Sequence, residues 1–420
     1  MKCVIIGSDI NAYYHARCFH EYTSEKAHLI VKIPMAFTRL SKILTYEVHD
    51  NLNDEFIFLR ALLDYAAQNN SPDKILLIAT NDTYLKLLCS FKEELSTYYK
   101  FVTPSFEIAN IFLDKELFYQ KYQSDLPLPK TILYDFGSDS IPDISEFTFP
   151  IIGKPNDHTI WDNISFDNKK KVYKIHTNDE FQKVISDISS AGFSGTFIIQ
   201  EFIEGDDYDL YHVDTYTNEG VSNILGFAWV GLQEHQDSAI GNDSVLISNA
   251  HSMTVTTDKI ESIKATICSF LEKVNYTGFA QIDLKWDNSR QEFYLFEINP
   301  RLGRASYYIS KLGYNPIKIL DKGFKVSEGL AVGAGGDSDG VSGHESGGDS
   351  DKMVALSFVP NSVIKTHINN SLFVDTYLKL ESENQTVHPL DYKLDISIRR
   401  KLWLYIRAKR FIKKFNENKW

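Results

Sequence analysis

Residues 280–304, AQIDLKWDNSRQEFYLFEINPRLGR, contain two strand-like segments separated by a polar stretch at residues 288–291. This pattern predicts a β-hairpin, and a turn centred near residue 290 places Asp283 directly across from Glu297. Two opposed carboxylates repel each other, so a fold without a use for them rarely pairs them. A divalent cation removes that conflict. The hairpin therefore predicts a metal site, unless its acids simply face water as on many charged surface hairpins.

The second strand of the hairpin is predicted to present its polar side chains on one face. The two-residue period of a strand places four residues on the same side, namely Phe293, Leu295, Glu297 and Asn299. Oxygens of Asp, Glu and Asn suit Mg²⁺, which keeps part of its shell for water and phosphates. Arg301 and Arg304 follow the strand. Guanidinium groups beside a metal are what a phosphoryl-transfer site needs against developing negative charge.

The rest of the chain predicts an α/β unit followed by an α+β unit. At 420 residues the chain is long enough for two or three packed units. Residues 1–110 alternate strand-like and helix-like segments, which is typical of a parallel sheet covered by helices. Residues 148–299 hold mostly strand candidates with helices near 177–191 and 258–274. That pattern favours antiparallel strands with helices on one side.

Composition narrows the classes of function. A formal net charge of −12 argues against a general nucleic-acid binder, and no nucleic-acid partner is expected. The longest apolar stretches are strand-sized, so we expect no membrane span and no secretory segment. The four cysteines lack zinc-site spacing and are expected to be free thiols. These features favour a cytoplasmic protein.

Two other segments carry weaker signals. Lys154 follows the apolar strand FPIIG, where a lysine can neutralise phosphate, although it more often extends to water. Residues 196–210, TFIIQEFIEGDDYDL, form an apolar strand that breaks into an acidic loop. Main-chain groups at 201–203 can pair with adenine and Asp207 with ribose, but a plain strand with an acidic turn also fits. No GxxxxGK[ST] phosphate loop or dinucleotide fingerprint is present.

Taken in order, these segments resemble the ATP-grasp superfamily. The resemblance rests on four motifs at the separations of that family: a helix with Asp114, Lys115 and Phe118, the strand-end Lys154-Pro155, the hinge QEFIEGDD, and the pair ID and FEINPR. It covers most of residues 1–325 and implies an ATP-grasp fold. The cofactors implied are ATP and Mg²⁺, with two ions expected and Mn²⁺ as the alternative metal.

The resemblance also implies a domain plan and residue roles. The plan is a Rossmann-like α/β domain at 1–112, an ATP-grasp domain at 113–325 with a small lobe at about 145–203, a Gly/Ser/Asp-rich loop at 327–352 and a C-terminal extension at 353–420. The nucleotide would bind between two α+β lobes. Its phosphates would contact Lys115 and Lys154, its adenine Gln200 and the main chain of Glu201, Phe202 and Ile203, and its ribose Glu204 or Asp207. The metal ligands would be Asp283, Glu297 and Asn299, Arg301 would stabilise the acyl phosphate, and Arg304 would bind the substrate carboxylate.

More narrowly, the opening IIGSDINAYYHARCFHE and the overall length resemble bacterial D-aspartate ligases. These attach D-aspartate to the lysine side-chain amine of a peptidoglycan precursor, with ADP and phosphate as products. A ligase for another amino acid or small peptide, and a non-catalytic nucleotide-binding module, remain alternatives. The sequence departs from the family after Lys154, where NDHTIWDN replaces a Gly/Ser-rich loop and leaves Asn156, His158 or Thr159 to close over the γ-phosphate.

The C-terminal segment, residues 399–420, predicts a basic amphipathic helix. It carries nine Lys and Arg against the single Glu417, and its apolar stripe consists of Leu404, Ala408, Phe411 and Phe415. We favour packing of this stripe on the protein's own acidic body. The alternative is peripheral contact with anionic lipid at the inner face of the membrane.

Overall fold

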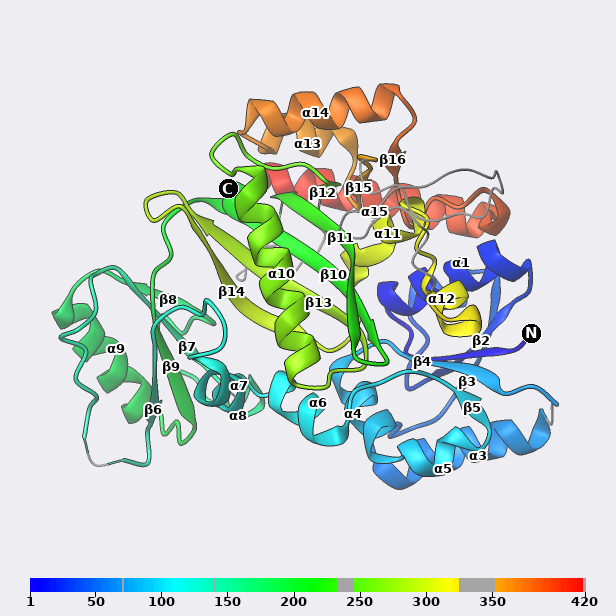
Figure 1. Cartoon of the computed structure of the whole chain (residues 1–420), viewed down its shortest axis with the longest axis horizontal. Coiled ribbons are helices and arrows are strands. Elements are labelled where there is room, and N and C mark those ends of the chain that lie inside the picture. The colour runs from blue at the N-terminus through cyan, green and yellow to red at the C-terminus, as the bar shows by residue number, and fades with distance from the viewer. Residues whose placement is uncertain (70–71, 139, 157, 233–244, 325–351, 418–420) are drawn as a thin grey trace, which may run out of the picture.

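The computed structural model describes residues 1–69, 72–138, 140–156, 158–232, 245–324 and 352–417. The described residues form three sheets: a parallel sheet at the lower right of Figure 1, a four-stranded sheet at the left, which belongs to a small lobe, and a large sheet between them. The predicted combination of a parallel α/β sheet with antiparallel sheets is confirmed. The predicted domain boundaries stay a proposal.

The parallel sheet has the strand order β3-β2-β1-β4-β5. Its strands are β1 (Cys3–Ile6), β2 (Ala27–Val31), β3 (Leu44–Val48), β4 (Ile75–Ala79) and β5 (Tyr99–Lys100). Val4 and Ile6 pack among the residues of α3 (Glu55–Gln68) and α4 (Asp82–Ser90), whereas Cys3 and Ile5 pack with those of α1 (Ile10–Thr23). Because helices cover both faces, β1 and β4 are buried throughout and read as continuous apolar runs.

The helices of this unit are α1 (Ile10–Thr23), α2 (Ala36–Arg39), α3 (Glu55–Gln68), α4 (Asp82–Ser90), α5 (Lys92–Ser96) and α6 (Phe106–Leu113). Side chains at the cap positions accept main-chain N–H groups, as Asp9 does for α1 and Asn81 for α4. The strand order reverses between β1 and β4, and in open α/β sheets the loops that follow two such strands form the crevice at the carboxyl edge of the sheet.

The small lobe is a four-stranded sheet in the order β6-β9-β7-β8. Its elements are β6 (Thr131–Asp135), β7 (Ile151–Pro155), α8 (His158–Asn163), β8 (Tyr173–Ile175), α9 (Asn178–Ser190) and β9 (Thr196–Glu201). One face packs Ile151 and Ile199 with Phe181 and Ile185 of α9. On the other face, Lys154 points toward the large sheet. The helix α7 (Lys115–Tyr122) precedes the small lobe in the chain and connects it to the parallel-sheet unit.

The large sheet has seven strands in the order β14-β13-β10-β11-β12-β15-β16. They are β10 (Leu210–Asn218), β11 (Val221–Leu232), β12 (Val245–Ser248), β13 (Gly278–Asp287), β14 (Glu292–Asn299), β15 (Ala355–Ser357) and β16 (Thr386–Val387). The helix α10 (Thr257–Lys273) covers one face, where Ile263 and Ile267 join the core formed by Ile282 and Leu284. The strands β15 and β16 show that the C-terminal segment completes this sheet.

A β-bulge on β14 corrects one prediction. Asp287 pairs with Glu292 and Leu284 with Leu295, but Asp283 pairs with Glu297, so Phe296 is an extra residue. The predicted Asp283–Glu297 pair is therefore confirmed. The prediction that one face holds Phe293, Leu295, Glu297 and Asn299 is wrong, because Phe293 and Leu295 lie in the core while Glu297 lines the opposite, cleft side. The bulge shifts the side-chain alternation by one residue.

The remaining helices are α11 (Tyr308–Lys311), α12 (Pro316–Lys322), α13 (Asn361–His367), α14 (Ser371–Ser382) and α15 (Ile398–Glu417), with 3₁₀ turns at Asp207–Asp209, Arg304–Tyr307 and Lys393–Asp395. Phe411 and Phe415 of α15 are buried in the core, and Leu404 packs beside it. Packing of the predicted stripe on the protein itself is confirmed. None of the helices described has the length and apolar character needed to cross a bilayer. Residues 327–351 of the predicted loop lie outside the described residues.

Candidate active site

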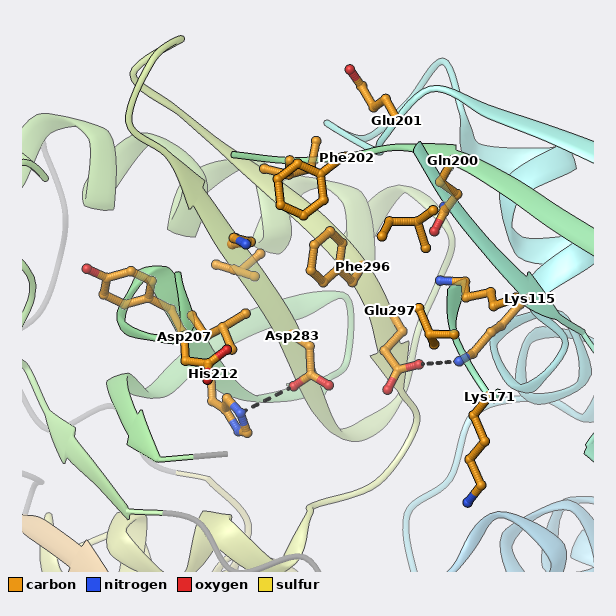
Figure 2. Close-up of a pocket in the computed structure, with 18 of the residues that line it drawn as sticks. Lys115, Lys171, Gln200, Glu201, Phe202, Asp207, His212, Asp283, Phe296 and Glu297 are labelled. Atoms are coloured by element: carbon orange, nitrogen blue, oxygen red, sulfur yellow. Dashed lines mark ion pairs between the residues drawn. The ribbon is translucent and has the colours of Figure 1, made fainter. Parts of the chain in front are cut away.

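Three polar side chains line up across the strands β10, β13 and β14 of the large sheet. The register places His212 opposite Asp283, and Asp283 opposite Glu297. Nε2 of His212 lies 3.7 Å from Oδ1 of Asp283, and Figure 2 shows the two acids side by side at the base of the cleft. Burial, followed by the charge of Arg304, lowers the pKa of His212 to about 4. The imidazole is therefore neutral and offers no positive charge to Asp283.

The two acids of the hairpin respond differently to their environment. Burial, and then the negative charge of Glu297, raise the pKa of Asp283 well above its usual range. Burial also opposes ionisation of Glu297, but the charge and hydrogen bond of Lys115, the charge of Lys154 and a hydrogen bond with Asp283 together outweigh burial and lower the pKa of Glu297 to about 2. The Lys115 Nζ lies 3.2 Å from the Glu297 Oε2. One lysine thus neutralises one of two acids that lie in contact.

The residues present fit a divalent cation. The buried Oδ1 of Asp283 has no hydrogen-bond partner, and the Nδ2 of Asn299 donates to Oε1 of Glu297 at 3.4 Å. A carboxylate oxygen without a hydrogen-bond partner, next to a second carboxylate, provides the kind of oxygen ligands that a hard cation binds. Within the described parts of the chain, no cluster of three or more His, Cys, Asp or Glu forms a self-contained metal cage. A cation held here would need the two carboxylates, an amide and phosphate oxygens of a ligand.

The opposite wall of the cleft contributes positive charge. Lys115 is the first residue of α7, whose N-terminus is capped by Asp114, and Lys154 comes from β7 of the small lobe. Burial, and then the nearby Lys115, lower the pKa of Lys154 to about 7. A buried lysine whose charged form is disfavoured beside a second lysine indicates a site for phosphate oxygens.

A cleft of about 620 Å³ lies between the two walls. Most of the predicted nucleotide contacts line it: Lys115, Lys154, Gln200, Glu201, Phe202, Ile203 and Asp207, with two of the predicted metal ligands, Asp283 and Glu297. The side chain of Glu201 points away in Figure 2, because its carboxylate accepts from the Lys130 N–H at 2.8 Å and pairs with Arg290 at 2.8 Å. Only its main chain is available to a base. Glu204 is exposed and is not part of the lining.

The two predicted arginines lie past the end of β14, outside the lining of this cleft. Nε of Arg301 donates to Oδ1 of Asp82 at 2.6 Å. Burial raises the pKa of Asp9 above its usual value. The charges of Arg301 and Arg304 act in the opposite direction but do not outweigh burial. Asp9 and Asp82 stand at the N-termini of α1 and α4, on the two sides of the crevice between β1 and β4. The arginines therefore connect the hairpin of β13 and β14 to the parallel sheet.

The chain is 31% identical to the D-aspartate ligase of Enterococcus faecium (strain Aus0004) over 324 residues, which cover 76% of this chain and 75% of that protein. The family model of the carbamoyl-phosphate synthase L chain, ATP binding domain, matches residues 229–332. This chain belongs to the ATP-grasp superfamily of carboxylate–amine ligases. An ATP-grasp ligase forms C–N bonds at the expense of ATP, which becomes ADP and phosphate.

Solved structures agree with the ATP-grasp fold. The L-amino acid ligase of Bacillus licheniformis superimposes with a TM-score of 0.54 at 14% identity, over 77% of this chain and 73% of that one. The biotin carboxylase of Campylobacter jejuni gives a TM-score of 0.54 at 14% identity, over 77% and 72%. At these identities the likeness concerns the fold alone. ATP-grasp enzymes generally bind ATP together with Mg²⁺.

Several residues of the ATP-grasp cleft were missed from the sequence, namely Lys171, His212, Lys285 and Phe296. Lys285 follows Asp283 by two residues, so the strand period was a sufficient signal for it. Phe296 and Glu297 line the cleft together only because of the bulge, and His212 joins them only through the pairing of β10 with β13. Of the three candidates for closing over phosphate, Asn156 donates to Asp114 at 3.2 Å, and the side chains of His158 and Thr159 lie outside those described.

Proposed function

We propose that this ligase joins D-aspartate to the side-chain amine of a lysine in a peptidoglycan precursor. The observation that carries the proposal is the similarity to a D-aspartate ligase over three quarters of both chains. The matched length of 324 residues exceeds the ATP-binding segment at 229–332, so the similarity is not limited to that segment. The donor, the acceptor and the residue roles below are parts of this proposal.

ATP is proposed to lie along the cleft between the two walls. The adenine would pair with the main chain at 201–203, near the Gln200 amide, while Asp207 holds the ribose. The phosphates would then extend toward Lys115 and Lys154. Asp283, Glu297 and Asn299 would hold one or two Mg²⁺ ions, with Mn²⁺ as a substitute. When bound, the metal would offset charge on the terminal phosphates and polarise them for transfer.

The donor amino acid is proposed to bind in the crevice between β1 and β4. The buried Asn11 ties this crevice to the metal hairpin, because its Nδ2 donates to the Thr80 carbonyl at 2.9 Å and to the Leu302 carbonyl at 3.0 Å. Arg301 and Arg304 supply positive charge, and Asp9 and Asp82 supply negative charge. An amino acid with two carboxylates and one ammonium group complements such a set.

The reaction follows from these positions. An oxygen of the donor carboxylate attacks the γ-phosphorus of ATP, the bond to the bridging oxygen breaks, and ADP leaves. The product is an acyl phosphate, whose negative charge Arg301 and Lys154 would offset. The lysine amine of the acceptor attacks the acyl carbon, loses a proton, and phosphate leaves. The protein orients the reactants and excludes water, and no side-chain nucleophile is required.

A substrate panel tests the proposal. Full-length enzyme with Mg²⁺ and ATP is supplied with single D- or L-amino acids, each with a lysine-containing peptide, and phosphate release and amide formation are measured. We expect turnover with D-aspartate and the peptide together. Turnover with a different donor would make the chain a ligase for that amino acid, and no turnover with any donor would favour a nucleotide-binding regulatory module.

A further inference from the structure

The helix α15 presents a second apolar face that is exposed in the part of the chain that the structure describes. Its inner face is fixed to the protein by three contacts. Arg400 is buried against Asp395 at 3.3 Å, the Trp403 ring meets Phe37 edge to face at 5.2 Å, and Phe411 is buried in the core. The helix is therefore docked rather than loose. Its orientation fixes which side chains point away from the molecule.

Apolar side chains line the outward side of this docked helix. Successive residues advance by about 100° around an α-helix, so residues four, seven and eight positions after Ile398 lie close to its direction. The exposed fractions are large at Ile398 (88%), Tyr405 (61%) and Leu402 (58%), and Leu394 in the preceding 3₁₀ turn is 66% exposed. A single exposed leucine is ordinary, but a continuous stripe on a fixed helix indicates an interaction surface.

Positive charge surrounds this stripe. We define the outer face of α15 as the stripe Ile398, Leu402, Tyr405 and Ile406 with the exposed cations Arg399, Lys401, Lys409, Arg410 and Lys413. Glu417 is the one acidic residue of the helix, and it pairs with Lys413 at 3.6 Å. The whole chain has a net charge of −12, so the positive charge of the outer face is opposite in sign to the net charge of the molecule.

We propose that the outer face of α15 docks the protein on an anionic lipid surface. Apolar side chains flanked by cations match a bilayer whose headgroups are negative and whose acyl chains lie just beneath them. A second copy of this chain would bring two sets of like charges together, which opposes self-association through this face. Nucleic acid would use the cations but not the apolar stripe. The inference is independent of the donor and acceptor proposed above.

Co-sedimentation with vesicles tests the proposal on full-length protein. We expect binding to vesicles of phosphatidylglycerol and phosphatidylcholine in equal parts, and little binding to phosphatidylcholine alone. Leu402→Ser with Tyr405→Ser should remove the apolar contribution and lower the partition coefficient at least about tenfold. Lys409→Gln with Arg410→Gln should lower it by a similar factor. ATP turnover without vesicles should be unchanged in both, because these residues lie outside the cleft.

A matched control keeps the result specific. Phe56→Ser removes an exposed aromatic side chain (69%) from α3, which lies at the opposite edge of the molecule from α15 in Figure 1. This variant should bind vesicles like the natural protein. Equal pelleting with anionic and neutral vesicles, equal pelleting of the α15 variants, or conversion of a dimer to a monomer by Leu402→Ser with Tyr405→Ser in light scattering would each overturn the proposal.

Discussion

The two walls of the nucleotide cleft carry charges of opposite sign. The wall from the large sheet presents Asp283 and Glu297, whereas the wall from the small lobe and α7 presents Lys154 and Lys115. Each wall alone is electrostatically unfavourable, since burial raises the pKa of Asp283 and lowers that of Lys154. A metal–nucleotide complex provides a cation for one wall and phosphates for the other. The opposite charges of the two walls therefore indicate that the cleft binds a ligand that carries both positive and negative charge.

The largest effect is expected on the acidic wall. Glu297→Gln removes the carboxylate that both the proposed metal and Lys115 use, so kcat/KM for ATP should fall by about a thousand-fold or more, as the loss of several kcal/mol implies. ADP release in the presence of donor and acceptor measures it. Glu292→Gln is the matched control, because Glu292 is exposed on the same strand. Full turnover by Glu297→Gln would show that the acidic wall has no part in the reaction.

A smaller effect is expected on the basic wall. Lys154→Met keeps the length and apolar character of the side chain but removes the charge that faces phosphate, and kcat/KM for ATP should fall by about a hundred-fold. Lys130→Met is a suitable control, since Lys130 belongs to the small lobe and pairs with Glu146 at 2.6 Å. An equal loss in both variants would assign the effect to folding of the lobe rather than to phosphate contact.

The smallest effect separates the two ribose candidates. Asp207 lines the cleft and Glu204 does not, so Asp207→Asn should raise KM for ATP about fivefold, the value of one hydrogen bond of about 1 kcal/mol. Glu204→Gln should leave KM unchanged. Initial rates at varied ATP concentration measure both. The opposite result would place the ribose against Glu204 and require the nucleotide to lie closer to the hinge.

Part of the site was predictable because its signal is local. The short turn of the hairpin that holds Asp283 and Glu297, and the cap that Asp114 provides for the N-terminus of α7, where Lys115 lies, depend on residues near in sequence. The arginine positions were predictable along the chain, but their partners were not. Arg301 meets Asp82 across 219 residues, and no periodicity in either segment reports that contact.

The sequence by itself determined the sheet classes, the acidic pair, the lysines and the amphipathic character of α15, because hydrophobic period and residue type act within single elements. Only the tertiary structure decided which faces these elements present. The bulge at Phe296 is held by contacts from outside the hairpin, where Tyr119 donates to the Phe296 carbonyl at 2.8 Å and the Pro127 carbonyl accepts from the Leu295 N–H at 2.9 Å. Likewise, burial of Phe411 leaves Leu402 and Tyr405 outside. Such choices depend on contacts between distant segments, which local patterns do not encode.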